Sequence, residues 1–441
     1  MFLEKWIHQQ IKEASNLKDF QFLKLKSILD YAYSNSPFYR DLYNNSGIKP
    51  SDIGSLEDLP LIPFTQPENL KEEPNRLLCV SFSKVKRVFT LFTGGTSGTP
   101  KKLLFSEKDL DRVTDYMGAA MKSVAEEGGI SDPGFKAYIL LPNGKPESQL
   151  KLLARGLEKI GAIPISGDVS SGTQLQVEAI QKSSPDILFG STSKIYRITQ
   201  EARRDYDLSK LGVKIVFVTS EYVPNSMRER LRDVWNADVF THFGMTELGF
   251  AGGIECQAHD GYHFNEADFL LEVVDPETGV VLRNGEEGQL VITSLNREAM
   301  PLIRYRTDDL CRITDQACEC GASSIKKMDK SVRRIESIVK LKIGDEIYPS
   351  IFDDVLYRMP NIINYDVSLT HEEDKERLEV AVEVLNEWSK AREEITGAIL
   401  SIPSIGKSIE ANLMIEPRVE LREQGTMKRV GRVKKLIMQK H

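Results

Sequence analysis

Short apolar strands alternate with helical segments through the middle of the chain, and this alternation is the strongest constraint on its fold. Helical stretches such as ESQLKLLARGLEKI and SMRERLRDVW separate the expected strands. Such an alternation is typical of a largely parallel sheet whose strands are joined by crossover helices. We therefore predict an α/β fold in which a large, multi-layer domain is built on mostly parallel sheets. The expected strands read RVFTLFT, KAYILLP, GAIPIS, DILFGS, KIVFVTSE and DVFTHFG.

The two ends of the chain have other patterns. Apolar residues recur at helical spacing near the start, so residues 1–80 are expected to form a helical segment. The strands in FLLEVVDPETGVVL and EGQLVITSL are joined by Pro/Gly turns, which predicts an antiparallel, β-rich subdomain over 265–334. Residues 335–441 mix strands and helices in the manner of a small α+β domain. The predicted division is therefore a large domain over 1–334 and a small domain over 335–441.

Composition narrows the class of protein. With 441 residues, 41% of them hydrophobic, and a formal charge of −7, the chain is expected to be globular and to bind small molecules rather than nucleic acid. Its start lacks the basic residues and unbroken apolar stretch of a signal peptide, and no run approaches the ~20 apolar residues of a membrane span. Five widely spread cysteines fit a reducing compartment. We expect a cytoplasmic protein with no nucleic-acid or membrane partner.

The loop LFTGGTSGTPKK, residues 91–102, has the composition of a phosphate clasp. Its glycines let backbone N–H groups approach anionic oxygens, its threonines and serine add hydroxyl donors, and Lys101 or Lys102 adds positive charge. The spacing excludes a P-loop, which requires G-x-x-x-x-G-K-[ST]. Two other interpretations stay open for the loop alone. One is a surface turn before a helix, and the other is the dinucleotide loop of a short-chain, NAD(P)-dependent reductase.

Three motifs, in order, resemble the core motifs of the AMP-forming adenylating (ANL) superfamily. The loop looks like the first motif, and THFGMTELG at 241–249 is similar to the aromatic-Gly-x-Thr-Glu motif. YRTDDL at 305–310 is similar to Tyr-Arg-Thr-Gly-Asp-Leu, with Asp308 in place of the glycine. The segments YAYSNSPFYRDLY, PISGDVSSGTQLQ and PDILFGSTS narrow the resemblance to the phenylacetate-CoA ligase and CapK-like branch. The resemblance covers the chain from about residue 20 onward and implies that the small C-terminal domain is mobile.

The resemblance also implies roles for individual residues at an ATP/AMP site. Thr246 would bond the α-phosphate and Glu247 would bind Mg²⁺, and both count as catalytic. Phe243 would stack near adenine, and Asp309 would accept the ribose hydroxyls. A carboxylate suits a hard cation, and an aromatic ring suits a base. The implied nucleotide-binding residues are Thr93, Gly94, Gly95, Thr96, Ser97, Gly98, Ser220, Glu221, His242, Phe243, Gly244, Thr246, Asp309 and Arg334.

The acyl pocket of this branch would be bordered by residues 140–144, by residues 190–193 and by the segment from Ser220 to His242. Two roles stay open for His242: it orients the substrate, or it is a structural histidine. The expected small-molecule partner is a carboxylic acid, of the aryl or arylacetic class, and the motifs leave an aliphatic acid open as the alternative.

The reaction implied by the resemblance begins with a carboxylate that attacks the α-phosphorus of ATP. Pyrophosphate leaves, an acyl-AMP remains, and a thiol, expected to be that of coenzyme A, then accepts the acyl group. This chemistry needs no nucleophilic side chain, and the sequence has no local signature of one. An amine, a hydroxyl or a carrier-protein thiol stays open as the acceptor. Two further possibilities stay open: the protein is a homodimer, or it binds a nucleotide without catalysing a reaction.

The chain departs from the superfamily pattern near its C-terminus. EQGTMKRVGR places Thr426 where the catalytic lysine of the family is expected, and Lys428 is the nearest substitute. On a strand these two side chains would face the same side, so we predict that Lys428 is catalytic. The alternative is that Lys428 and Arg429 are surface charges. Glu336 replaces the pivot aspartate of the hinge, so the sequence supports adenylation more firmly than acyl transfer.

Four residues in two clusters have the chemistry of a zinc site. ECQAHDGYH contains Cys256 and His263, and ACECG contains Cys318 and Cys320. Thiolates and imidazoles are the ligands that Zn²⁺ prefers, and the resemblance implies a structural zinc at such positions. The alternative is that the thiols and the histidine bind no ion. We expect a closed Cys₃His site that stabilises the fold and takes no part in catalysis.

Overall fold

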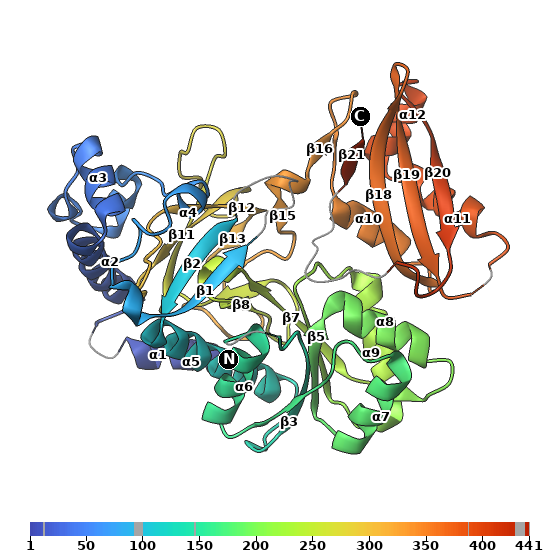
Figure 1. Ribbon diagram of the computed structural model, residues 1–441, viewed down its shortest axis with the longest axis horizontal. Helices are drawn as coiled ribbons and strands as arrows, with labels where there is room; N and C mark the ends of the chain where they lie inside the picture. The colour runs from blue at the N-terminus through green and yellow to red at the C-terminus, as the bar shows by residue number, and fades with distance from the viewer. Residues whose placement is uncertain (12–13, 92–99, 145–146, 387, 428–436, 441) are drawn as a thin grey trace. The chain divides into compact units, whose positions relative to one another are not determined.

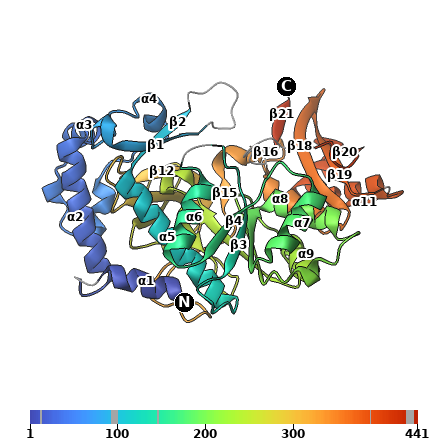
Figure 2. The same ribbon diagram turned by 60° about the horizontal axis from the view of Figure 1, so that its bottom comes forward.

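The computed structural model describes all residues except 12–13, 92–99, 145–146, 387, 428–436 and 441. The mixed α/β architecture agrees with the expected fold class. The domain boundary after residue 334 stays a prediction. The described residues form two compact units (Figures 1 and 2). The first consists of Met1–Phe135, Pro142–Pro164 and His242–Val332, and the second of Lys136–Leu141, Ile165–Thr241 and Arg333–His441.

The first unit begins with three helices, as the sequence predicts. Helices α1 (Phe2–Gln10), α2 (Leu17–Asn35) and α3 (Pro37–Ser46) are followed by 3₁₀ turns at Pro50–Asp52 and Leu56–Leu61 and by α4 (Asn69–Glu72). Asn16 caps α2 by accepting a hydrogen bond from the backbone N–H of Asp19, and Ser36 caps α3 in the same way. In both views α1 lies alongside α5 (Figures 1 and 2).

A hairpin flanks the glycine-rich loop. Strands β1 (Val85–Leu91) and β2 (Lys101–Ser106) pair antiparallel in a sheet of their own. The expectation that the first strand joins the parallel sheet was therefore wrong. The connection between β1 and β2 is too short for a crossover helix, and a parallel pair requires a crossover of a dozen or more residues. Ser106 then begins α5 (Glu107–Glu127) with a capping box, and α6 (Gln149–Lys159) packs against α5.

The predicted β-rich layer is antiparallel and belongs to the first unit. Strands β10 (Phe269–Val274), β11 (Gly288–Ser294) and β12 (Tyr305–Cys311) pair in this order. Smaller strands pair antiparallel beside the end of β7 (Asp238–Gly244). These are β8 (Gly252–Ile254), β9 (Tyr262–Phe264), β14 (Lys327–Met328) and β13 (Ile313–Thr314).

The second unit contains the predicted parallel strands. β3 (Lys136–Leu140), β5 (Ile187–Ser191), β6 (Ile215–Thr219) and β7 pair in parallel in the order β7-β6-β5-β3. Crossover helices join them, because successive parallel strands begin at the same end of the sheet. The helices are α7 (Thr173–Ser183), α8 (Thr192–Ala202) and α9 (Asn225–Trp235), and β4 (Ile163–Ser166) is a short edge strand.

The C-terminal part of the second unit is an α+β layer, as expected. β18 (Ile362–Glu372) and β19 (Lys375–Val384) form a hairpin, and β20 (Met414–Arg422) and β21 (Met438–Lys440) add in parallel to give the order β20-β19-β18-β21. The remaining elements are β15 (Arg333–Arg334), β16 (Val339–Lys340), β17 (Glu346–Ile347), α10 (Pro349–Leu356), α11 (Ala391–Leu400) and α12 (Pro403–Glu410).

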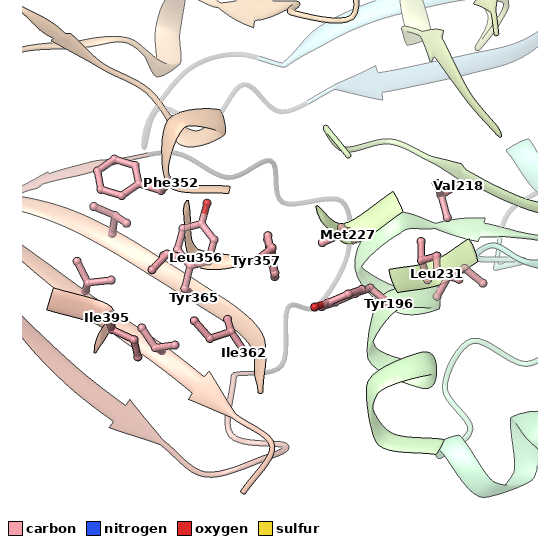
Figure 3. Close-up of a cluster of buried hydrophobic side chains, with 14 of the residues drawn as sticks. Tyr196, Val218, Met227, Leu231, Phe352, Leu356, Tyr357, Ile362, Tyr365 and Ile395 are labelled. Carbon is pink, nitrogen blue, oxygen red and sulfur yellow. The ribbon is translucent and has the colours of Figure 1, made fainter. Parts of the chain in front are cut away.

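One hydrophobic core joins this layer to α8 and α9. Figure 3 shows Tyr196, Met227 and Leu231 on the side of these two helices, with Tyr357 and Ile362 facing them. The rings of Tyr196 and Tyr357 meet edge to face with 5.3 Å between their centroids. The second unit therefore owes its compactness to residues that are more than 100 positions apart in the chain. Of the helices in the described part of the chain, none combines the length and apolar character that a membrane span needs.

Candidate active site

The predicted Thr-Glu pair lies in a buried turn that follows β7. Thr246 and Glu247 belong to a 3₁₀ turn, Thr246–Leu248, which ends at Gly249 in the left-handed conformation, φ 68°. Both side chains are buried. Arg297 contacts the backbone of this turn: its Nη1 donates a hydrogen bond of 2.7 Å to the carbonyl oxygen of Glu247.

Arg297 is itself buried. Its guanidinium lies over the ring of Phe105, 4.0 Å from the centroid, and burial lowers its pKa to about 10. Its Nη2 atom has no hydrogen-bond partner among the described residues. The role of Arg297 is not visible in the sequence, since an arginine in the segment NREAMP has no local signal that distinguishes a buried group from a surface charge.

A buried lysine connects the end of the glycine-rich loop to two of the motifs. The Lys101 ammonium donates hydrogen bonds of 3.1 Å to Asp308 Oδ2 and 3.2 Å to Tyr305 Oη. It also lies 3.6 Å from Glu247 Oε1, and the Tyr305 hydroxyl donates to the same carboxylate oxygen at 3.4 Å. The structure thus brings together Lys101, Glu247 and the YRTDDL motif in one cluster of the first unit.

A bulge in β12 sets the direction of the acidic side chains in that motif. Gln289 pairs with Leu310, but Val291 pairs with Arg306, so the three residues between them on β12 lie opposite the single residue Leu290 of β11. Bulges of this kind re-aim side chains. Asp309 is buried, and its N–H donates to the Thr307 hydroxyl at 3.2 Å. The strand therefore carries a buried carboxylate, Asp309, next to a half-buried one, Asp308, that contacts Lys101.

The Glu247 site fits a magnesium ion. Its ligand groups are oxygens, and Mg²⁺ in nucleotide sites is usually held by one or two carboxylates together with phosphates and water. Glu247 supplies one buried carboxylate next to the stem of the glycine-rich loop.

The backbones of β7 and β8 lie close together because glycines occupy the paired positions. Phe243 pairs with Gly253 and Gly244 with Gly252, and a Cβ atom at Gly244 would lie only 2.8 Å from the carbonyl oxygen of Phe250. The Phe243 ring is half-buried and lies 6.4 Å from that of Tyr262, measured between centroids. His242 is half-buried on the same strand.

The other predicted nucleotide-binding residues lie elsewhere. Thr93, Gly94, Gly95, Thr96, Ser97, Gly98 and Lys428 are outside the described residues, so their predicted roles are untested. Ser220, Glu221 and Arg334 belong to the second unit. There Ser220 has a positive φ of 79°, and the Glu221 carboxylate accepts a 2.8 Å hydrogen bond from Ser193. Arg334 pairs with Glu336 at 3.7 Å. Thr426 lies in a bend after β20 and not on a strand, so the alternation of side chains along a strand does not apply at this position.

The two cysteine clusters meet in the first unit, as the zinc prediction requires. One ligand atom from each of four residues lies within 4.8 Å of all the others: Cys256, His263, Cys318 and Cys320. The sulfurs of Cys256 and Cys318 are 3.6 Å apart, and Cys320 Sγ is 3.3 Å from His263 Nε2. Ligand atoms around a tetrahedral zinc lie roughly 3.4–3.8 Å apart, given Zn–S bonds of about 2.3 Å. The donor set and its spacing therefore fit Zn²⁺.

Burial sets the protonation of the ligands in this cluster. It raises the pKa of the Cys256 and Cys320 thiols and lowers the pKa of His263 to about 4, with Lys327 adding to the shift of the histidine. The His263 Nδ1 atom is buried without a partner among the described residues. His259, which lies between Cys256 and His263 in the sequence, is 3.6 Å from Glu255 and is not in the cluster.

The fold and the site are those of a nucleotide-binding enzyme. The sequence pattern of the AMP-binding enzyme family matches residues 60–296, and that of the AMP-binding enzyme C-terminal domain matches residues 344–440. The chain belongs to this family. Membership excludes the alternative of a short-chain, NAD(P)-dependent reductase.

Curated relatives show which enzymes of this family the chain is similar to. The chain is 30% identical to phenylacetate-coenzyme A ligase of Thermus thermophilus, over 83% of this chain and 81% of the relative. It is 29% identical to the same enzyme of Aromatoleum evansii, over 87% and 86%. A crystal structure of 2-hydroxyisobutyryl-CoA ligase in the postadenylation state has the same fold, with a TM-score of 0.75 and 21% identity over 93% of this chain and 86% of the other.

Proposed function

We propose that the protein is an AMP-forming acid–CoA ligase: it activates a carboxylic acid with ATP to an acyl-AMP and then transfers the acyl group to coenzyme A. The observation that carries this proposal is the joining of Lys101, Glu247 and the YRTDDL strand in one buried cluster. The similarity to phenylacetate-coenzyme A ligases over more than four-fifths of the chain supports it. We further propose an aryl or arylacetic acid as the substrate.

Each residue has a task in the adenylation step. The Thr246 hydroxyl binds the α-phosphate, Asp309 binds the ribose, and Phe243 contacts the base. Glu247 holds Mg²⁺, which offsets charge on the phosphates when it is bound. Positioning and charge compensation of this kind are most of what a protein contributes to such a transfer. The loop residues 93–98 and Lys428 are proposed to complete the site, on the strength of the sequence alone.

The Cys₃His cluster is proposed to hold a structural zinc ion. Cys256, His263, Cys318 and Cys320 would fill all four positions of a tetrahedral site. No position would remain for substrate, so the ion would stabilise the segments that contain Cys256 and Cys318. All five cysteines are free thiols, which supports the proposal of a cytoplasmic location.

Pyrophosphate exchange tests the proposal. The purified protein is mixed with ATP, Mg²⁺ and labelled pyrophosphate, together with one acid at a time from a panel of arylacetic, benzoic and aliphatic acids. We expect exchange that depends on the acid and is fastest with an arylacetic or aryl acid. Exchange with no acid in the panel, despite ATP binding, would contradict the proposal and favour a binding protein.

The acceptor is tested separately. The acyl-AMP is generated in place and offered coenzyme A, a carrier protein or an amine, and the products are identified by mass spectrometry. A thioester with coenzyme A is expected. An amide, or acylation of the carrier protein alone, would leave adenylation intact but replace the proposed acceptor. Size-exclusion chromatography with light scattering tests the homodimer that the sequence left open.

A further inference from the structure

The ammonium of Lys101 has three N–H donors, and three acceptors surround it. They are Asp308 Oδ2 at 3.1 Å, Tyr305 Oη at 3.2 Å and Glu247 Oε1 at 3.6 Å. Lys101 is buried, with 4% of its side chain exposed, so its charge must be offset by these neighbours. The two shorter contacts are hydrogen bonds, whereas the contact with Glu247 is longer than a normal hydrogen bond.

The carboxylates of Asp308 and Glu247 differ in their contact with Lys101. Asp308 is 27% exposed and holds the lysine, while Glu247 is 6% exposed and keeps only a long contact with it. An ammonium held close to a carboxylate offsets part of its charge and so weakens the attraction of that carboxylate for a cation. Asp308 therefore takes the closer contact with the ammonium, so that Glu247 keeps more of its charge for Mg²⁺.

The geometry points to Asp308 as a positioning residue for the magnesium nucleotide, one that acts through Lys101. This inference rests on the proposed function, because it takes Glu247 as the Mg²⁺ ligand. The glycine that the family motif has at this position has no side chain with which to hold the lysine. Lys101 would then pair with Glu247 and compete with the cation. The bulge in β12 is what brings both Asp308 and Asp309 to useful positions on one strand.

The test compares Asp308→Gly, Asp308→Asn and wild-type protein by calorimetry with α,β-methylene-ATP over a range of Mg²⁺ concentrations. Binding requires no acid and no turnover, so its outcome is independent of the exchange assay. We expect both variants to need about tenfold more Mg²⁺ for half-maximal binding, which is the scale of one charge-assisted hydrogen bond. Affinity for AMP in EDTA should change less than about twofold, since AMP requires no cation.

A second set of variants, made in the Lys101→Met protein, shows whether Asp308 acts through Lys101 or binds the cation directly. In Lys101→Met protein, Asp308→Gly should cause no further change in the Mg²⁺ requirement. An unchanged requirement in the single variants would overturn the inference, and so would a full Asp308 effect in the Lys101→Met background, which would make Asp308 a direct ligand. Asp115→Asn, which breaks the exposed Asp115–Lys159 pair, is the matched control and should change nothing.

Failure of the proposed function has a different signature. Glu247→Gln should lose the Mg²⁺ dependence of binding altogether. If it keeps that dependence, the assignment of Glu247 is wrong. If the Asp308 variants have the Mg²⁺ requirement of the wild type while Glu247→Gln loses its Mg²⁺ dependence, the proposed function is retained and the role of Asp308 is rejected. Thermal unfolding of every variant shows whether a loss of binding is merely a loss of folded protein.

Discussion

Arg197 on α8 and Glu383 on β19 form a two-pronged ion pair, with both N–O distances equal to 2.7 Å. Glu383 is completely buried, and the same carboxylate accepts a hydrogen bond of 2.6 Å from the N–H of Gly425. Arg197 also donates to the carbonyl oxygen of Met427 at 3.3 Å. One buried carboxylate thus joins α8, the C-terminal sheet and the turn at its end.

Breaking this pair should destabilise the second unit. Glu383→Ala leaves a partly buried guanidinium with Glu201 as its one remaining ion partner among the described residues, and we expect a loss of about 3–5 kcal/mol in the free energy of unfolding. Urea denaturation followed by circular dichroism measures it. The double variant Arg197→Met/Glu383→Leu should lose less than the single one, because it removes both charges of the pair and takes an ion partner only from Glu201, which is less buried than Glu383. A loss under ~1 kcal/mol for Glu383→Ala would show that water replaces the pair without cost.

Glu247→Gln should reduce acid-dependent pyrophosphate exchange by at least about 100-fold. The amide keeps the size of the side chain but removes the charge that binds Mg²⁺, and lost charge compensation has effects of this order. The initial rate of exchange is the measurement. Glu126→Gln, an exposed change on α5, should leave the rate unaltered. Near-normal exchange in the Glu247 variant would remove this residue from the site.

Arg297→Met should impair Mg²⁺-dependent exchange, although we place Arg297 behind the Glu247 turn and not in contact with substrate. The carbonyl of Glu247 loses its donor, which costs about 1–3 kcal/mol of stability for an unpaired buried group. The Mg²⁺ requirement for exchange should rise at the same time, because the turn that bears Glu247 is no longer held. Arg297→Lys should restore part of both effects. If stability falls while the Mg²⁺ requirement stays as in wild type, Arg297 has only a structural role.

Asp309→Asn should weaken recognition of the ribose. An amide donates where the hydroxyls of the sugar also donate, so we expect KM for ATP to rise roughly tenfold with a smaller change in kcat. The discriminating measurement compares ATP with 2′-deoxy-ATP. Wild-type protein should prefer ATP, and the variant should prefer it less. An unchanged preference would place the ribose elsewhere.

The purified protein should contain about one zinc ion per chain, as measured by mass spectrometry of the metal. Removal of zinc by a chelator should lower the melting temperature by roughly 5–10 °C, since a structural ion stabilises only the folded state. Cys318→Ser should lose the metal, whereas Cys79→Ala, outside the cluster, should retain it. Exchange activity at low temperature should survive zinc removal. Loss of activity with no change in melting temperature would indicate a catalytic ion instead.

Local patterns in the sequence were sufficient to predict the elements. The periodicity of apolar residues gave the strands that became β3, β5, β6 and β7, and the turn-rich segment after residue 265 gave the antiparallel layer of β10 and β11. Such patterns are readable because a helix or strand repeats its geometry within a few residues. The exception was the strand at Val85–Leu91, where the pairing partner depends on the length of a connection and not on periodicity.

What the sequence by itself determined, then, is the order of elements and the motifs to which we assign chemistry: Glu247, Asp309 and the four residues of the proposed zinc site. Tertiary structure decided which of these meet. Lys101 reaches Asp308 across 207 positions, and Arg197 reaches Glu383 across 186. No local pattern encodes such pairs, because they depend on how separate layers pack and on the bulge that turns the acidic residues of β12. Burial then gives these contacts their strength, since a charge removed from water must be matched by its neighbours.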